Sequence, residues 1–331
     1  MTPVQSDSPS VLHVNDCAFT AERLLVEAHR RGLPWHFLPV AATGRTWVGP
    51  RAKAEKAVRG AAWLARLAGG AARHDLLHVH SGSVYRHSRL VPRRFVLHLH
   101  GTDIRTLQYD PAWRRTIHDA VTSARAVFFS TPDLAEHTLP LRPDATYLPV
   151  PIDVGRLPRW QPADGTPRVL FASRWDPSKG IDAQLSTAEA LVRGLAGRAE
   201  VVGLDWGEAA SRAAAAGVRL LPRTDHEGYL RTLAGAHVVV GQSAGILAAS
   251  ELEALGVGAP LVLPVDLPLY EGLTPPVAGG AVDEAVDAVR TLLAAAPDET
   301  AAEVRRAWVA EHHGVEQAVD TVLSVYRRVV S

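Results

Sequence analysis

The chain has 331 residues, 47% of them hydrophobic, with 35 basic and 35 acidic side chains. Two domains are expected, because this length exceeds what one hydrophobic core usually serves, and no apolar run approaches the roughly 20 residues of a membrane-spanning helix. The net charge is +7 over residues 1–150 (19 basic minus 12 acidic) and −7 over residues 151–331 (16 minus 23). The positive charge of the first part is too weak to indicate nucleic-acid binding. The difference between the two parts is consistent with domains that have different ligands.

Short apolar runs alternate with helical patterns through the first half of the chain. Strands are predicted at 10–15, 35–40, 75–80, 95–100, 126–130 and 146–150, and helices at 18–31 and 51–68. In the second of these helices Val58, Ala62 and Leu67 form one apolar side. Strands that alternate with helices indicate βαβ units and a parallel sheet.

Residues 151–167 are dense in proline and glycine, which is typical of a linker or hinge. The alternation then restarts, with strands at 168–173, 200–204, 218–221, 237–241 and 260–263, helices at 182–195, 226–234 and 247–255, and a helical tail from 281. The predicted fold class is α/β, with two doubly wound (Rossmann-like) domains that face each other across a cleft. We expect domains at 1–155 and 156–314, and a C-terminal helix at 315–331 that packs back on the first domain.

Polar residues follow three strands of the first domain, where open parallel sheets bind their ligands. Asn15 and Asp16 come after the first strand, and His80 and His100 end two others. These four side chains should therefore line one crevice. Histidines also recur two residues apart at 78/80 and 98/100, so each pair shares one strand face and could suit a metal. Without cysteine support or a recognisable metal motif, we interpret them as crevice and core histidines and expect neither a metal nor a cofactor.

Residues 100–105 (HGTDIR) follow a strand that is expected to be buried. One interpretation is a turn, with Gly101 for its conformation and Asp103 as a helix cap. The other is a site in which His100 and Asp103 contact a sugar hydroxyl or assist proton transfer. Both roles can coexist in one segment.

Residues 173–180 (SRWDPSKG) contain Lys179, one of only three lysines in the chain. Arg174 and Lys179 leave a parallel strand beside a turn, an arrangement that can clamp a diphosphate or form a solvated turn. The small residues from 243 lead into a helix whose amino end favours phosphate. Glu253, further along this helix, could accept hydrogen bonds from ribose hydroxyls or lie on the surface.

Five segments together resemble the GT-B-fold glycosyltransferases that use nucleotide-sugar donors, in particular the retaining family 4 type. They are HGTDIR (100–105), FFSTPDL (128–134), LPVPID (148–153), SRWDPSKG (173–180) and ELEALGVGAP (251–260), and they occur in the family's order along most of the chain. The resemblance implies an N-terminal acceptor-binding domain and a C-terminal domain that binds the nucleotide sugar. It also implies a hexosyltransferase that moves a sugar from a UDP or GDP donor to a hydroxyl acceptor, with retention and without a metal.

The resemblance also implies roles for individual residues. Arg174 and Lys179 would hold the diphosphate, and Glu253 the ribose. The segment from Gly245 through Ile246 to Leu247 would contact the donor. His100 and Asp103 would be catalytic, and the acceptor would lie against Asn15, Asp16 and His80.

Two departures from the family pattern leave alternatives open. The family places a sugar-contacting glutamate where this chain has Gly245, and a glycine-rich loop where it has NDCAFTAERLL (15–25). The donor sugar therefore stays unassigned, and the alternatives are a non-catalytic nucleotide-sugar-binding subunit or a non-hydrolysing nucleotide-sugar epimerase.

The expected partners are a nucleotide-sugar donor and either a small-molecule or a glycan acceptor, not nucleic acid. The basic run YRHSRLVPRR (85–94) could steer a phosphorylated or lipid-linked acceptor, touch an anionic membrane surface peripherally, or simply be solvated. A single cysteine, Cys17, and a start without a signal-peptide pattern lead us to expect a cytoplasmic location.

Overall fold

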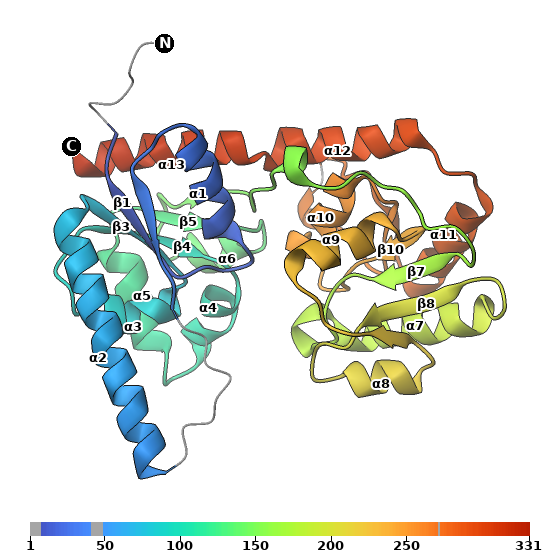
Figure 1. Ribbon diagram of the computed structural model, residues 1–331, viewed down its shortest axis with the longest axis horizontal. Helices are drawn as coiled ribbons and strands as arrows, with labels where there is room; N and C mark the ends of the chain where they lie inside the picture. The colour runs from blue at the N-terminus through green and yellow to red at the C-terminus, as the bar shows by residue number, and fades with distance from the viewer. Residues whose placement is uncertain (1–7, 41–48, 271) are drawn as a thin grey trace. The chain divides into compact units, whose positions relative to one another are not determined.

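The computed structural model describes residues 8–40, 49–270 and 272–331, which divide into two compact units (Figure 1). The first unit runs to Pro151 and includes Val315–Ser331, and the second comprises Ile152–Gly314. In the described residues each unit has a six-stranded sheet in which all paired strands run parallel. The predicted α/β class with two doubly wound domains is confirmed.

Six strands form the sheet of the first unit: β1 (Val11–Val14), β2 (Trp35–Leu38), β3 (Leu76–His80), β4 (Phe95–Leu99), β5 (Val127–Phe129) and β6 (Thr146–Tyr147). Their order is β2-β1-β3-β4-β5-β6, so the winding direction reverses between β1 and β3. In open α/β sheets such a reversal leaves a ligand crevice outside the carboxyl ends of the strands. Asn15 and His80 lie at the ends of these two strands.

The helices and 3-10 turns that connect these strands are α1 (Thr20–Arg30), α2 (Pro50–Arg73), η1 (Gly82–Val84), α3 (Tyr85–Ser88), α4 (Thr102–Arg105), η2 (Leu107–Tyr109), α5 (Arg114–Ser123) and α6 (Leu134–Thr138). Successive residues of β1 belong to two different cores. Leu12 packs with Leu67 of α2 and Ile117 of α5, whereas Val11 packs with Leu24 of α1. The period of two along the strand therefore buries both faces of the sheet.

The terminal helix α13 (Val315–Val330) covers the same face as α1, and Figure 1 shows the two helices side by side. Its apolar residues recur at helical spacing, and Val319, Val322 and Tyr326 are 0% exposed in the core that contains Val11. At its polar edge Arg31 lies 2.5 Å from Asp320. The last helix of the sequence thus belongs to the first unit.

The sheet of the second unit has strands β7 (Arg168–Phe171), β8 (Glu200–Leu204), β9 (Arg219–Leu221), β10 (Val238–Val240), β11 (Leu261–Leu263) and β12 (Ala278–Gly279). The order β12-β11-β10-β7-β8-β9 reverses direction at β7, which pairs with both β8 and β10. The remaining elements are η3 (Val154–Arg156), η4 (Pro177–Lys179), α7 (Ile181–Gly194), α8 (Ala210–Ala215), α9 (His226–Ala234), α10 (Ala249–Val257), η5 (Pro268–Tyr270), α11 (Val282–Ala294) and α12 (Glu299–His313).

Apart from β12, for which no strand was predicted, the strands and the long helices lie where the alternation of patterns predicts them, but several elements differ. The short helices α5, α6 and α8 were missed, since five to ten residues give a weak periodic signal. In α2 only Leu67 of the expected apolar side is buried, whereas Ala62 is exposed and Val58 is 69% exposed. Among the described residues, no helix combines the length and apolarity that crossing a bilayer requires.

Candidate functional site

The loop after β7 forms a tight turn that carries two cations. Asp176 Oδ1 accepts hydrogen bonds from Ser178 N at 3.1 Å and from Ser178 Oγ at 2.6 Å, which caps η4. Arg174 Nε lies 3.4 Å from Asp176 Oδ2, and its side chain is 38% exposed. The turn thereby holds Arg174 and Lys179 at the carboxyl edge of the second sheet.

A second loop, residues 241–248 between β10 and α10, is attached to this turn. Ser243 N donates a hydrogen bond to Lys179 O at 2.9 Å. A Cβ placed on Gly180 would lie 2.6 Å from Ser243 O, so the two backbones meet where no side chain fits. The tertiary structure therefore brings together the two segments that the sequence predicts to bind the donor.

Replacement of Gly180 by alanine should disrupt this junction. Gly180 has a φ of +72°, and the added Cβ would also clash with the Ser243 backbone. Gly197 is a matched control, because it has the same φ of +72° and nothing within 4 Å of its added Cβ. In urea denaturation we expect Gly180→Ala to cost about 1–3 kcal/mol more than Gly197→Ala. Equal costs for the two variants would show that the contact between Gly180 and Ser243 does not contribute to the free energy of unfolding.

The predicted donor-contacting segment exposes little side chain. Gly245 has a φ of +71°, a conformation that glutamate would adopt only with strain. The side chains of Ile246 and Leu247 are buried, and Leu247 N donates to the Tyr270 hydroxyl at 3.2 Å. The helix begins at Ala249, two residues later than expected. A ligand here would therefore meet backbone groups rather than these side chains.

Two glutamates of α10 are buried, of which the sequence singled out only one. Glu253 is 3% exposed, and its Oε1 lies 2.6 Å from His226 Nε2. Glu251 is 0% exposed and accepts from Gln242 N at 3.2 Å and from Ala248 N at 3.1 Å. Glu251 thus ties the 241–248 loop to the first turn of α10. Its place three residues after the N-cap is the signal that could have revealed it.

In the first unit, Asn15 and Asp16 shape the loop after β1. Asn15 has a φ of +72°, and its Nδ2 donates to His80 O at 3.0 Å. Asp16 Oδ1 accepts from Ala21 N at 2.9 Å at the start of α1. Burial raises the pKa of Asp16, although amide hydrogen bonds from the helix oppose this effect. The structure therefore gives both residues a part in forming the loop.

Asp103 is the anchor of the loop after β4. It is 3% exposed, and its carboxylate accepts hydrogen bonds from the amides of four residues, which are Gly82 (3.0 Å), His100 (3.2 Å), Gly101 (3.0 Å) and Ile104 (3.0 Å). Because both oxygens already receive amide donors, this geometry favours the turn interpretation of Asp103 over proton transfer. The expected helix cap is wrong, since the N-cap of α4 is Gly101 and Asp103 is the second residue of the helix.

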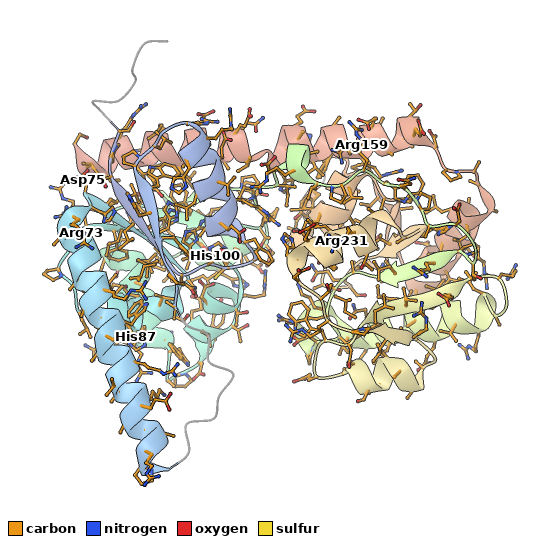
Figure 2. All side chains as sticks on the ribbon, viewed as in Figure 1. Arg73, Asp75, His87, His100, Arg159 and Arg231 are labelled. Atoms are coloured by element: carbon orange, nitrogen blue, oxygen red, sulfur yellow. The ribbon has the colours of Figure 1, made fainter. Side chains whose placement is uncertain are left out.

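Five histidines lie together on the face of the first sheet that α1 and α13 cover. They are His13 on β1, His78 and His80 on β3, His98 on β4 and His100 just after β4. The first four are 0% exposed, whereas His100, labelled in Figure 2, is partly exposed. Their residue types and alternation were visible in the sequence. That three neighbouring strands place them in one stack was not.

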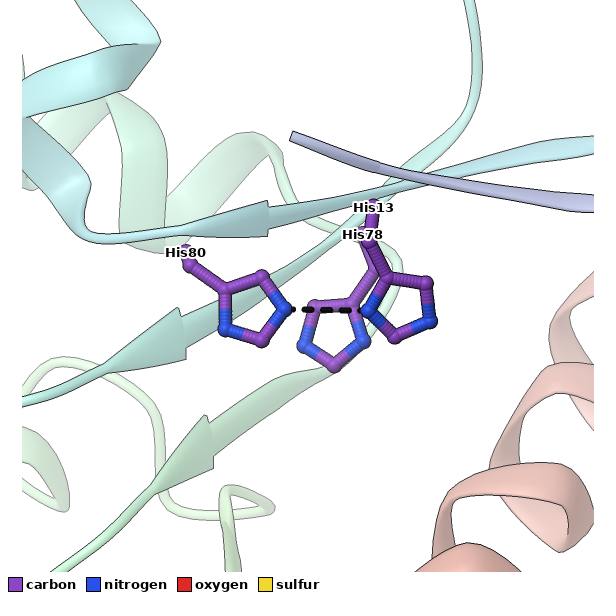
Figure 3. Close-up of side chains that lie close together, drawn as sticks. All are labelled: His13, His78 and His80. Atoms are coloured by element: carbon purple, nitrogen blue, oxygen red, sulfur yellow. Dashed lines mark hydrogen bonds between the residues drawn. The ribbon is translucent and has the colours of Figure 1, made fainter. Parts of the chain in front are cut away.

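Hydrogen bonds join ring nitrogens of three of these histidines, His13, His80 and His100. His80 Nε2 lies 3.1 Å from His13 Nδ1, the contact drawn in Figure 3, and His80 Nδ1 lies 3.1 Å from His100 Nε2. Burial lowers the pKa of His13 to about 3 and that of His100 to about 4, the latter opposed by the Asp103 carboxylate. At neutral pH these imidazoles are therefore uncharged.

Two histidine triads bring ligand atoms within 4.8 Å of one another, one of residues 13, 78 and 80 and one of residues 80, 98 and 100. A metal ion must lie near the plane of each imidazole that binds it. The rings of His78 and His80 instead stack with an interplanar angle of 12°, and those of His13 and His80 with 27°. This geometry fits stacked, hydrogen-bonded imidazoles better than converging metal ligands.

An aromatic residue that sequence reasoning missed lies beside the candidate diphosphate clamp. Trp206 follows β8 and is 42% exposed. The guanidinium carbon of Arg174 lies 5.8 Å from its ring centroid, and that of Arg223 lies 4.9 Å away. Such cation–π contacts restrain the Arg174 side chain. The sequence contained a signal for this residue, because Trp206 lies two positions after the strand predicted at 200–204.

Part of the basic run at 85–94 is engaged within the first unit. Arg93 donates to His74 O, and Arg94 Nη1 donates to Val330 O at 3.0 Å. Arg89 and Leu90 are exposed. At least two arginines of this run therefore donate hydrogen bonds to backbone carbonyls, which supports a structural role for the run.

Comparison with solved structures identifies the fold. The chain is 13% identical to a Staphylococcus aureus TarM variant in complex with fondaparinux, alpha-GlcNAc-glycerol and UDP (TM-score 0.59), over 76% of this chain and 55% of that one. It is 13% identical to a UDP-forming α,α-trehalose-phosphate synthase from Burkholderia xenovorans (TM-score 0.68), over 98% of this chain and 100% of that one. The likeness shows the fold.

A third structure has a different provisional name. It is a UDP-N-acetylglucosamine 2-epimerase from Listeria monocytogenes, 15% identical (TM-score 0.58), over 96% of this chain and 95% of that one. No family model and no curated protein sequence matches the chain. The chain thus shares a two-domain architecture with proteins named for different reactions, and its function must be argued from its own residues.

Proposed function

We propose that the chain is a glycosyltransferase that moves a sugar from a nucleoside diphosphate donor, most simply a UDP-sugar, to a hydroxyl acceptor. The observation that carries the proposal is the junction of the Arg174–Lys179 turn with the 241–248 loop at the reversal point of the second sheet. There two cations and a loop with a left-handed glycine lie where open α/β sheets bind phosphates. Two of the similar structures are named for UDP or a UDP-forming reaction.

In the proposed reaction the two cations hold the diphosphate while the bond from the sugar carbon to it breaks. The acceptor oxygen forms the new bond to that carbon, and the hydroxyl proton passes to the leaving diphosphate. Arg174 supplies a planar fork that Trp206 and Asp176 orient, and Lys179 supplies a compact charge. Their charges stabilise the leaving diphosphate, so the step requires no metal. Retention and the hexosyl class of the donor rest on the family resemblance. Glu253 would bind the ribose, with its Oε1 lying 2.6 Å from His226 Nε2.

Nucleotide binding provides the first test. In a thermal-shift panel of UDP, GDP, ADP and dTDP, a ligand at 100 times its Kd should add about 2.7 kcal/mol of stability. Arg174→Ala and Lys179→Ala should each weaken binding by about 10- to 100-fold, because each removes charge-assisted hydrogen bonds. Lys53→Ala, an exposed residue of α2, is the control that keeps the shift. The donor site is refuted if no nucleotide shifts the melting temperature.

On the acceptor side, we propose that His100 contacts the acceptor hydroxyl, with Asp103 holding its loop. His100→Ala should keep the nucleotide-induced shift, because His100 belongs to the first unit. It should lower kcat for UDP release in the presence of acceptor by about 10²–10⁴-fold. The matched control is His118→Ala, on α5. Unchanged turnover in His100→Ala would remove this residue from the mechanism.

The epimerase alternative is kept because one similar structure carries that name. An epimerase consumes a UDP-sugar without acceptor and forms an isomeric UDP-sugar, whereas a transferase releases UDP when acceptor is present. Product analysis by anion-exchange chromatography separates the two. Nucleotide binding without either product would instead support a non-catalytic subunit, for which Gly245 is the motivating residue.

We propose a small-molecule or glycan acceptor, no nucleic-acid partner and no resident metal or cofactor. The carbonyl contacts of Arg93 and Arg94 make peripheral membrane contact through the 85–94 run a minor proposal. Sedimentation with vesicles that contain anionic lipid would test that contact directly.

A further inference from the structure

A pocket of about 170 Å³ lies near the amino-terminal ends of β3 and β4 in the first unit. Leu77, the second residue of β3, pairs in register with Phe95, the first residue of β4, and both line the pocket. Its other apolar walls are Tyr85, Val91 and Pro92. His100 follows the opposite end of β4, roughly 16 Å along the strand, so this pocket is separate from the crevice at His100.

The apolar walls of this pocket suit one small ring. An apolar cavity of about 150 Å³ is large enough to bind benzene. The rings of Tyr85 and Phe95 lie 5.3 Å apart between centroids with an interplanar angle of 30°. They form an aromatic wall, against which a further ring would pack in an offset or tilted arrangement. The pocket is too small to enclose the acyl chain of a lipid as well.

One buried polar atom of this pocket has no partner. Ser88, at the end of α3, is 4% exposed and lines the pocket. Its Oγ makes no hydrogen bond among the described residues. Buried hydroxyl groups normally have a hydrogen-bond partner, because an unpaired one is unfavourable. A ligand oxygen in the pocket would accept the hydrogen of this hydroxyl.

Two arginines and no acidic residue line the same pocket. Arg89 is exposed, and within the described ranges its guanidinium makes neither a hydrogen bond nor an ion pair. Arg93 donates to His74 O, and this carbonyl restrains the guanidinium without neutralising its charge. Guanidinium groups bind phosphate oxygens through paired N–H donors. The polar side of the pocket is therefore suited to a phosphate.

A neighbouring pocket of about 610 Å³ adds to the positive charge. It borders the first along residues 92–95, and Arg94, Arg125 and Arg142 line it, again without an acidic residue. Asp144 pairs with Arg142 at 2.5 Å and offsets one of these charges. The remaining arginines leave a positive potential beside the first pocket, which attracts anions.

We propose that the pocket at Ser88 binds a small soluble organic phosphate. An aryl group of this ligand packs against Tyr85 and Phe95. Its phosphate lies between Arg89 and Arg93 and accepts the hydrogen of the Ser88 hydroxyl. The site shares no residue with the proposed transferase site, so the proposal does not rest on that function.

Calorimetric titration of the full chain with phenyl phosphate at pH 8, where this probe is a dianion, tests the proposal. We expect one-to-one binding that weakens as KCl is added, because salt screens exposed charges. Inorganic phosphate and phenol should each bind at least about 10-fold more weakly, since each lacks one half of the probe. Absence of phenyl phosphate binding, or equal affinity for inorganic phosphate, overturns the proposal.

Single variants locate the bound probe. Arg89→Ala should weaken binding by about 10-fold or more, because it removes a charge-assisted contact at an exposed position that the fold does not need. Ser88→Ala should weaken it by about 2- to 10-fold through loss of the hydroxyl. Arg115→Ala, on α5 with a side chain 92% exposed, is the matched control and should bind as wild type does. Binding that is lost in Arg174→Ala but kept in Arg89→Ala would place the probe at the donor site and overturn the proposal.

A lipid headgroup offers the same phosphate chemistry, and vesicles separate this source from a soluble ligand. The full chain is sedimented with vesicles of phosphatidylcholine and phosphatidic acid. We expect Arg89→Ala to leave the sedimented fraction unchanged while it weakens phenyl phosphate binding. If Arg89→Ala instead abolishes sedimentation and phenyl phosphate does not bind the wild type, the arginines contact a lipid headgroup and the soluble ligand is refuted.

Discussion

Acidification from pH 8 to pH 5 is expected to destabilise the first unit strongly. His13, His78, His80 and His98 are 0% exposed, and burial lowers the pKa of each. The unfolded chain binds protons at these rings below about pH 6.5, whereas the folded chain does not, so the free energy of unfolding falls as the pH drops below that value. His13, whose pKa is lowered to about 3, alone contributes a loss of about 2 kcal/mol at pH 5, and the other three rings act in the same direction.

Urea denaturation followed by circular dichroism at several pH values measures this effect. His98→Leu is the informative variant, because both ring nitrogens of His98 are buried without a hydrogen-bond partner among the described residues. It should cost little at pH 8 and should reduce the acid loss by up to about 1.4 kcal/mol per pH unit. His80→Leu should already be destabilised at pH 8, since it breaks two hydrogen bonds. A stability that is flat between pH 7 and pH 5 would refute neutral burial of these rings.

Asp103→Ala is expected to cost about 3 kcal/mol or more. The variant leaves the backbone amides of Gly82, His100 and Gly101 without their acceptor, and each buried unsatisfied donor costs about 1–3 kcal/mol. The fourth amide, that of Ile104, keeps its hydrogen bond to Gly101 O. Because the same carboxylate fixes the loop that carries His100, turnover should fall as well. Nucleotide binding by the second unit should persist.

Asp75→Ala is the matched control for this prediction. Asp75 is an exposed residue of the same unit and accepts one hydrogen bond, from Ser10 N at 2.9 Å. Its loss should cost about 1 kcal/mol or less. Asp103→Asn, which retains one acceptor oxygen, should fall between the two aspartate-to-alanine variants. If Asp103→Ala were as stable as Asp75→Ala, the anchoring role of Asp103 would be wrong.

The periodicities of the sequence were sufficient for the sheet and the long helices. Runs such as 76–80 and 238–240 are apolar enough to be recognised as buried strands, and α9 falls where its helical spacing predicts it. Short helices such as α6 and the start of α10 were not accessible, because a few residues carry little periodic signal. The exposed turns of α2 show that helical spacing of apolar residues does not by itself predict burial. Val58 lies on the apolar side of the predicted helix but is exposed, because no neighbouring element has to pack against that side.

For the site, the sequence identified residue types and strand ends but not contacts. Arg174, Lys179 and the 241–248 loop could be placed at strand ends from topology alone. That Gly180 packs against Ser243 depends on residues far apart in the chain, whereas Glu251 binds the nearby amides of Gln242 and Ala248. Asp103 illustrates the same limit, because its amide partner Gly82 lies 21 positions away.

By itself the sequence determined two doubly wound α/β domains, a cationic turn after β7 and histidine pairs at alternating positions of two strands. Hydrophobic period and turn chemistry act locally, so they can be recognised in the order of the residues. Only the tertiary structure decided that Tyr326 of α13 meets His13 and His78. The physical reason is that side-chain hydrogen bonds and buried charge depend on which distant segments pack together, and a linear pattern does not encode that choice.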